Sequence, residues 1–340
     1  MVENLERLCV NMRTADSNVR RIGVLTSGGD APGMNAAIRA VVRTAVHHGI
    51  EVLGIKRGYN GLIHGEVLQM NSATVNGLIT RGGTILYTAR CPEFTTEEGL
   101  AKAGETIRYM GIDGLVAIGG DGTFRGALDV SRYGVNVVGI PATIDNDIGC
   151  THYTIGFDTA CNTAMSAIDK LRDTMQSHER CSIVEVMGRR AGHLALYVGL
   201  ACGATAILVP ELPMNFEHDV AEKIRRGRII GRTHHLIIVA EGTGNVNEVA
   251  ERVKSDTGLD PRVTILGHLQ RGGSPTARDR VTASRMGEVA VHELIEGRKN
   301  RVVSMLASEM KCLDMEEALK MEKGLQKSML EAAYVLTQNS

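Results

Sequence analysis

Short apolar runs alternate with longer amphipathic segments along most of this chain. Such alternation is typical of βαβ units, in which a helix connects two parallel strands. It therefore predicts an α/β fold with a mostly parallel sheet. The expected strands lie near residues 21–25, 51–55, 114–119, 135–140, 182–187, 205–209, 234–240 and 302–306. The expected helices lie near residues 33–48, 96–110, 123–132, 157–176, 216–228 and 276–296.

The length of 340 residues exceeds what one hydrophobic core usually spans, so we expect two domains. No Pro/Ser-rich linker and no low-complexity run separates two halves of the sequence. We therefore expect chain segments to cross between the domains, with the ligand site in the cleft between them.

Composition argues against several classes of protein. A net charge of -1 offers no overall attraction to nucleic acid or membrane, so an anionic ligand requires local arginine clusters. The seven cysteines include no CxxC pair and are expected to be reduced thiols. The first twenty residues contain no signal-peptide core, and no stretch approaches the roughly twenty apolar residues of a membrane span. We expect a soluble, cytoplasmic protein.

Two glycine-rich loops follow apolar runs, TSGGDAPG at 26–33 and GGDGT at 119–123. Glycine lets backbone N–H groups approach a phosphate, and the helix that follows presents its positive end. Asp121 adds a carboxylate that suits Mg²⁺, although both loops are also compatible with ordinary tight turns. The dinucleotide fingerprint is absent, because Arg125 stands where glycine or alanine is required, and no Walker A motif occurs. These loops therefore predict phosphate binding by a glycine-rich loop that differs from both of these motifs.

The segment Thr143-Ile144-Asp145-Asn146-Asp147 follows another apolar run and is the candidate catalytic loop. Phosphoryl transfer needs an aspartate to accept the proton of the acceptor hydroxyl. Asp145 and Asp147 are two residues apart, and we expect one to face the acceptor while the other supports the loop or a metal. The alternative is that these side chains only make turn hydrogen bonds.

Four arginines and one histidine in the second half of the chain supply positive charge. Arginine forks match phosphate oxygens bidentately, although each of these residues taken singly is more often a solvated surface group. The set comprises Arg180, Arg189, Arg262, His268 and Arg271. Neither HExxH nor GxSxG occurs, so zinc-protease and serine-hydrolase chemistry find no support.

With these motifs the chain resembles the ATP-dependent 6-phosphofructokinases of the bacterial type, from about residue 21 to about residue 297. Seven blocks carry the resemblance: GVLTSGGDAPGMNAAIR, RGGT, IGGDGT, TIDND, TIGFDTA, EVMGR and GHLQRGGSP. It implies two three-layer (αβα) domains with mostly parallel sheets and an active site in the cleft. The implied ATP-binding domain comprises 21–156 plus 270–319, the fructose 6-phosphate-binding domain comprises 157–269 plus 320–340, and 1–20 form an N-terminal extension.

The resemblance implies that the γ-phosphoryl group of ATP is transferred to the 1-hydroxyl of fructose 6-phosphate, with Mg²⁺, in glycolysis. It implies Asp145 as general base, Thr143 and Asp147 as its loop partners, Arg189 as stabiliser of the transferring group, and Asp121 as metal ligand. The implied ATP-binding residues are Gly29, Tyr59, Arg90, Cys91, Gly120, Asp121, Gly122 and Thr123. The implied substrate-binding residues are Thr143, Asp145, Met187, Gly188, Arg189, Glu241, His268 and Arg271, with Arg180 and Arg262 from a neighbouring subunit of a homotetramer.

Two positions bear on the phosphoryl donor. Pyrophosphate-using relatives generally carry aspartate and lysine where this chain has Gly122 and Ala142, so ATP is the expected donor. Ala142 nonetheless departs from the glycine commonest in ATP-dependent members. Pyrophosphate-dependent transfer and a catalytically silent regulatory subunit are the alternatives.

The family's effector site, which binds ADP or phosphoenolpyruvate, is matched only in part. Arg39, Arg43, Arg172, Gly203 and Arg232 match it or are compatible with it. Ser72 replaces an arginine, Thr205 a glutamate and Ile230 a lysine. We therefore hypothesise that regulation by these two effectors is weakened or lost.

Overall fold

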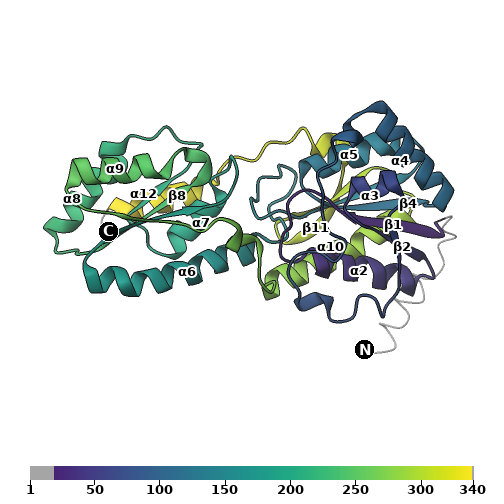
Figure 1. Cartoon of the computed structure of the whole chain (residues 1–340), viewed down its shortest axis with the longest axis horizontal. Helices are drawn as coiled ribbons and strands as arrows, with labels where there is room; N and C mark the ends of the chain where they lie inside the picture. Colours follow the sequence, from purple (N-terminus) through teal and green to yellow (C-terminus); the bar gives the residue numbers. More distant parts are fainter. Residues whose placement is uncertain (1–18, 339–340) are drawn as a thin grey trace. The chain divides into compact units, whose positions relative to one another are not determined.

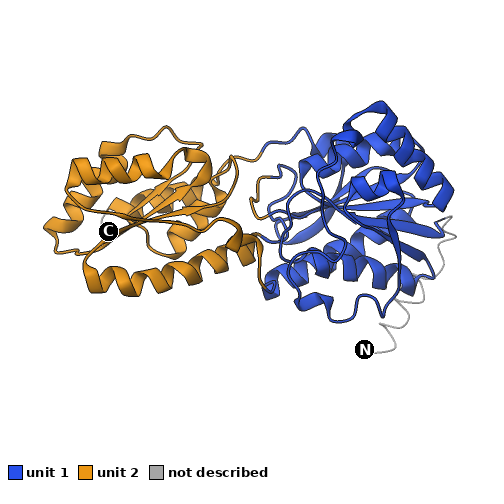
Figure 2. Ribbon diagram, in the orientation of Figure 1, with its two compact units in different colours: residues 1–143, 148–156, 274–322 blue, residues 144–147, 157–273, 323–340 orange. Residues whose placement is uncertain are grey.

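The computed structural model describes residues 19–338 and divides them into two compact units (Figure 2). Unit 1 comprises the described residues up to Thr143, with Ile148–Gly156 and Ser274–Glu322. Unit 2 comprises Ile144–Asp147, Phe157–Gly273 and the described residues from Lys323. Of the expected N-terminal extension, residues 1–18 lie outside the described residues, as does Cys9. Within residues 19–338 no helix is both long enough and apolar enough to cross a membrane.

Unit 1 contains a seven-stranded sheet in the order β11-β10-β5-β4-β1-β2-β3. The five inner strands are parallel, and both edge strands are antiparallel to their neighbours. The strands are β1 Arg21–Thr26, β2 Glu51–Ile55, β3 Val67–Met70, β4 Gly114–Gly119, β5 Asn136–Pro141, β10 Arg301–Leu306 and β11 Glu309–Asp314.

Helices cover both faces of this sheet, as Figure 1 shows. One face carries α2 Met34–His47 and α10 Ala277–Ile295, and the other carries α3 Tyr59–His64, α4 Glu97–Met110 and α5 Asp121–Ser131. All six residues of β4 are buried, as expected for a central strand with a helical layer on each side. The short α11, Met315–Ala318, follows the last strand.

Unit 2 is built on a smaller, fully parallel sheet in the order β7-β8-β6-β9. The strands are β6 Cys181–Val186, β7 Ala206–Leu208, β8 His235–Ala240 and β9 Arg262–Ile265. Two helices, α8 Glu222–Ile229 and α9 Val246–Thr257, pack on the face that bears Ile183 and Val239. The other face carries α6 Phe157–His178 and α7 His193–Ala201, and α12 Lys327–Gln338 lies beside α7.

All eight expected strands and all six expected helices are confirmed, and the α/β fold with them. Three strands were missed, β3, β9 and β11, each short or at a sheet edge and partly exposed. The missed helices include α7, whose sequence HLALYVGLA is apolar on all sides and therefore lacks a helical period. The other missed helices are α3, α9, α11 and α12.

The expected domain boundaries differ from the observed division at three short segments. Residues 144–147 belong to unit 2, where Lys323 Nζ donates a hydrogen bond of 2.9 Å to Asn146 Oδ1. Residues 270–273 also belong to unit 2, because the 3-10 helix η5, Gly267–Arg271, packs against α6. Residues 320–322 belong to unit 1. Which ligand each unit binds stays a prediction.

Candidate active site

The two glycine-rich loops of unit 1 lie side by side at the carboxyl edge of the sheet. They follow β1 and β4, which are adjacent and parallel, with Thr26 opposite Ile118. Ser27 N–H donates to Ile118 O at 3.0 Å, and Thr123 Oγ1 donates to Ser27 O at 3.1 Å. Contact between the loops is so close that a Cβ on Gly119 would lie 2.3 Å from Thr123 Oγ1. Glycine at this position is therefore a packing requirement.

Two buried side chains of unit 1 hold loop segments in place, Tyr59 at the second glycine-rich loop and Asn35 at residues 81–85. Tyr59 stacks on Phe94 with ring centroids 4.0 Å apart, and its hydroxyl donates to Thr123 O. Burial raises the pKa of Tyr59, so the hydroxyl stays a neutral donor. Asn35, the second residue of α2, donates to Arg81 O at 3.1 Å and accepts from Ile85 N–H at 2.8 Å, and so ties the segment 81–85 to the start of this helix. Sequence reasoning missed Asn35, although an asparagine among the apolar residues of a helix was an available signal.

The remaining predicted ATP-binding residues belong to the glycine-rich loops or to the segment that follows Tyr87. Gly29, Arg90 and Gly122 are exposed, and Cys91, Gly120 and Asp121 are half-buried. Thr26 Oγ1 donates to Tyr87 O at 3.0 Å and so ties the segment leading to Arg90 and Cys91 to the end of β1. Exposed glycine backbone and an exposed arginine are both suited to an anionic ligand.

Asp121 is the candidate metal ligand of unit 1. Among residues 19–338 no three His, Cys, Asp or Glu side chains converge as metal ligands. Asp121 is the first residue of α5 and adjoins the glycine loop. One carboxylate fits Mg²⁺ that is shared with a bound nucleotide, because this ion takes one or two carboxylates plus phosphate oxygens.

In unit 2 the loops that follow β6 and β8 pack against each other. These strands are adjacent and parallel, with Val186 opposite Ala240. Arg189 has a positive φ of 58°, and its main-chain N–H donates a hydrogen bond of 2.6 Å to Glu241 Oε1. A Cβ on Gly242 would lie 2.5 Å from Arg189 O, so the approach requires glycine there. The predicted residues Met187, Gly188, Arg189 and Glu241 are thus brought together.

Gln270 joins a third loop to this group. Its side chain is buried, accepts from Met187 N–H at 3.3 Å and donates to Gly267 O at 3.0 Å. The bond places η5, with the predicted residues His268 and Arg271, beside the β6 loop. No sequence signal marked Gln270, because a buried glutamine is recognisable only from its partners.

The residues of the candidate catalytic loop are divided between unit 1 and unit 2. Thr143 belongs to unit 1, where its carbonyl accepts from Thr154 Oγ1 at 2.6 Å, whereas Asp145 and Asp147 belong to unit 2. Asp145 is buried, and Asn146 between the two aspartates has a positive φ of 53°. Lys323, which donates to Asn146, was not predicted from the sequence.

Arg180 and Arg262 lie at the opposite edge of the unit 2 sheet from Arg189. Arg180 precedes β6 and Arg262 begins β9, opposite Ser182, whereas Arg189 follows the carboxyl end of β6. Both side chains are exposed. The structure therefore does not bring these two arginines to the Arg189 loop of the same chain.

The predicted effector residues of unit 2 also gather at that edge. Arg172 donates to Cys202 O, and Arg232 donates to Thr205 Oγ1 at 3.3 Å. Burial and the charge of Arg172 lower the pKa of Arg232. Gly203 adjoins this pair, and Ile230, which stands where a lysine was expected, is 70% exposed. Arg39 and Arg43 lie on α2 of unit 1.

Comparison with known proteins identifies the family. The phosphofructokinase family model matches residues 21–294. The chain belongs to the phosphofructokinase family. It is 53% identical over 94% of its length to the ATP-dependent 6-phosphofructokinase of Clostridium botulinum strain Loch Maree, and it covers 100% of that protein. A Clostridium perfringens protein named ATP-dependent 6-phosphofructokinase 1 is 54% identical over 94% of this chain and 99% of its own.

Solved structures of the family show the same fold. The phosphofructokinase of Saccharomyces cerevisiae matches with a TM-score of 0.84 at 36% identity, over 94% of this chain. This chain spans about half the length of the yeast chain, 47%. The α/β architecture described above is therefore that of phosphofructokinases.

Proposed function

We propose that this phosphofructokinase transfers the γ-phosphoryl group of ATP to the 1-hydroxyl of D-fructose 6-phosphate, giving fructose 1,6-bisphosphate and ADP in glycolysis. The observation that carries the proposal is 53% identity over the full length of a relative named for this ATP-dependent activity. We assign ATP to the glycine loops of unit 1 and the sugar phosphate to the arginine-bearing loops of unit 2.

In the proposed mechanism Asp145 accepts the proton of the 1-hydroxyl as its oxygen attacks the γ-phosphorus. The bond from that phosphorus to the bridging oxygen of ADP breaks as the new bond forms. Arg189 neutralises charge on the transferring group, and the Glu241 bond holds its backbone in position. Mg²⁺, held by Asp121 and the phosphates, would supply further charge neutralisation when bound.

Pyrophosphate as donor is the main alternative, and the surroundings of Gly122 and Ala142 argue against it. A Cβ on Gly122 would meet nothing within 4 Å, so no residue in the described part of the chain fills the space beside it. Ala142 is 1% exposed, and its N–H donates to Gly119 O at 3.0 Å. A lysine there would have to displace packed neighbours. Both positions favour a nucleotide over pyrophosphate.

A coupled assay of fructose 1,6-bisphosphate formation tests the proposal, with ATP and pyrophosphate compared at equal concentration. We expect turnover with ATP and little with pyrophosphate. The reverse preference would assign the pyrophosphate-dependent activity, and no product with either donor would assign the silent regulatory subunit.

We also propose that the enzyme is a cytoplasmic homotetramer in which Arg180 and Arg262 serve the active site of a neighbouring chain. Their place at the opposite sheet edge from Arg189 supports this arrangement. Mixing inactive Asp145→Ser and Arg262→Ala proteins under exchange conditions should restore part of the activity. Light scattering that gives a monomer with full activity would contradict the proposal.

A further inference from the structure

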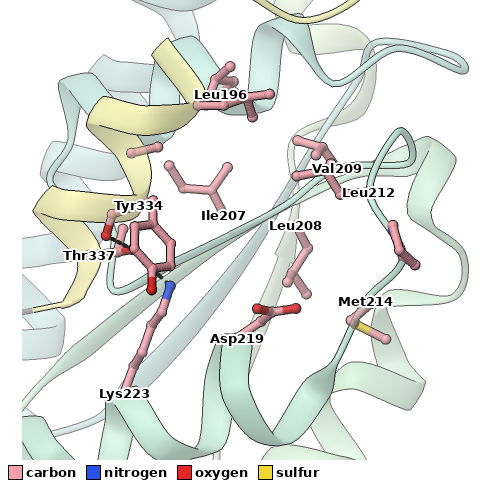
Figure 3. Close-up of a pocket in the computed structure, with 13 residues that line it drawn as sticks. Leu196, Ile207, Leu208, Val209, Leu212, Met214, Asp219, Lys223, Tyr334 and Thr337 are labelled. Atoms are coloured by element: carbon pink, nitrogen blue, oxygen red, sulfur yellow. Dashed lines mark hydrogen bonds between the residues drawn. The ribbon is translucent and has the colours of Figure 1, made fainter. Parts of the chain in front are cut away.

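A cavity of about 280 Å³ lies in unit 2, away from every residue assigned above to catalysis or to ligands. Figure 3 shows that it lies between α12, β7 with the loop that follows it, and the helical segment 217–229. Its wall is mostly apolar, and includes Leu196, Ile207, Leu212, Met214 and Leu330. The volume is that of roughly nine water molecules in the liquid, enough for a ligand of about ten non-hydrogen atoms.

The ammonium group of Lys223 lies in the wall of this mostly apolar cavity. Lys223 on α8 is 9% exposed, and its ammonium donates a hydrogen bond of 2.8 Å to Thr337 Oγ1 on α12. An ammonium carries three N–H donors, and within residues 19–338 Thr337 is the one hydrogen-bond acceptor of Lys223. Burial lowers the pKa of Lys223, and the negative charge of Asp219 offsets only part of this effect.

The nearby carboxylate of Asp219 is held by other groups. Asn215 N–H donates to Asp219 Oδ2 at 2.8 Å, and His218 Nδ1 lies 3.0 Å from Oδ1. The two remaining donors of Lys223 therefore lack a protein acceptor in the described part of the chain. An acceptor that entered the cavity would relieve the cost of the buried ammonium.

We propose that this cavity binds a small amphipathic carboxylate, with its apolar tail among the side chains of β7 and α12 and its carboxylate on Lys223. Concave, mostly apolar walls with one convergent charged group are the usual form of a small-molecule site. The ammonium gives the ligand its orientation, because a charge-assisted bond is stronger than a neutral one. The proposal is independent of which phosphoryl donor the enzyme uses.

Octanoate, with ten non-hydrogen atoms, is the probe, and isothermal titration of the full chain measures its binding. We expect one octanoate per chain, weaker binding of hexanoate by roughly fourfold per methylene, and still weaker binding of 1-octanol. Binding should also weaken at alkaline pH, where Lys223 loses its proton. Octanol binding as tight as octanoate would overturn the role of the ammonium.

Two variants test the site from different sides. Lys223→Met should weaken octanoate binding roughly tenfold to hundredfold, the usual loss for a bond to a charged group. Ala333→Phe fills the cavity and should abolish binding while the ammonium remains. Lys254→Met, which removes an exposed lysine of α9, is the control and should bind normally. All three variants should keep the kinase activity. If Ala333→Phe binds octanoate as tightly as the unmodified chain, the site is refuted, even if Lys223→Met fails to fold.

Discussion

The main-chain N–H of Arg189 donates a 2.6 Å hydrogen bond to the carboxylate of Glu241, and Arg189 there has a positive φ of 58°. Such a backbone conformation is unfavourable for a residue with a long side chain, so it persists only where neighbours enforce it. Glu241 thus holds the backbone of Arg189 in place and thereby positions the Arg189 guanidinium.

Glu241→Ala should therefore lower kcat by roughly tenfold to hundredfold, because the charged acceptor of the Arg189 N–H is lost. Glu241→Gln keeps an acceptor oxygen and should lose only about fivefold. Steady-state kinetics in fructose 6-phosphate check both variants, with Glu251→Ala on the exposed side of α9 as control. Equal kcat in all four proteins would show that this bond does not position Arg189.

Asp145→Ser should reduce turnover roughly 10²–10⁴-fold or more, the range for losing a positioned base. The KM for ATP should change little, because the predicted nucleotide residues lie in unit 1. The coupled assay measures the loss, and circular dichroism verifies folding. Unchanged turnover would remove Asp145 from the role of base.

Adjacent glycines of the second loop should respond differently to alanine. Gly119→Ala places a Cβ 2.3 Å from Thr123 Oγ1 and 2.4 Å from Ser27 O, so we expect a loss of about 1–3 kcal/mol in stability. Gly120→Ala meets no protein atom within 4 Å and should leave stability within about 0.5 kcal/mol. It should instead raise the KM for ATP, because the added methyl group occupies space assigned to phosphate. Thermal melts and ATP titrations separate the two effects, and a normal KM in Gly120→Ala would contradict the phosphate assignment.

Regulation by ADP and phosphoenolpyruvate should be weak. Arg232 hydrogen-bonds Thr205 where a glutamate was expected, and the exposed Ile230 replaces a positive charge. Initial rates at subsaturating fructose 6-phosphate, with each effector titrated, measure this. We expect little shift in half-saturation for this chain and a larger one after combined Ser72→Arg and Ile230→Lys substitution. A large shift from both effectors in the unmodified chain would refute the hypothesis.

His235 should make stability depend on pH between about 4 and 6.5. Both ring nitrogens are buried without a hydrogen-bond partner among residues 19–338, and burial lowers the pKa of His235 from 6.5 to about 4. The unfolded chain binds the proton first, so the stabilising contribution is present above pH 6.5 and is lost as pH falls towards 4. Between pH 7.5 and pH 5 the free energy of unfolding should therefore fall in the wild type. In His235→Leu this fall should be smaller by on the order of 1–2 kcal/mol. Denaturant melts measure this, and exposed His64→Gln should behave as wild type.

The parts of the site that could be predicted were those marked by a pattern within a few neighbouring residues of the sequence. Glycines and aspartates directly after apolar runs marked the loops at 26–33, 119–123 and 143–147, because a parallel sheet puts such loops at its carboxyl edge. Gln270 and Lys323 carried no comparable mark. Their roles depend on partners far along the chain, such as Met187, which lies 83 residues from Gln270.

The sequence by itself determined the alternation of strands and helices, the glycine loops and the family, because short-range periodicity and motif spacing encode them. The tertiary structure alone decided which residues support the site, where the units divide, and that α12 forms one wall of a cavity beside Lys223. Hydrogen bonds and packing between distant segments make those choices. Such contacts depend on the folded arrangement of the whole chain, which local patterns do not specify.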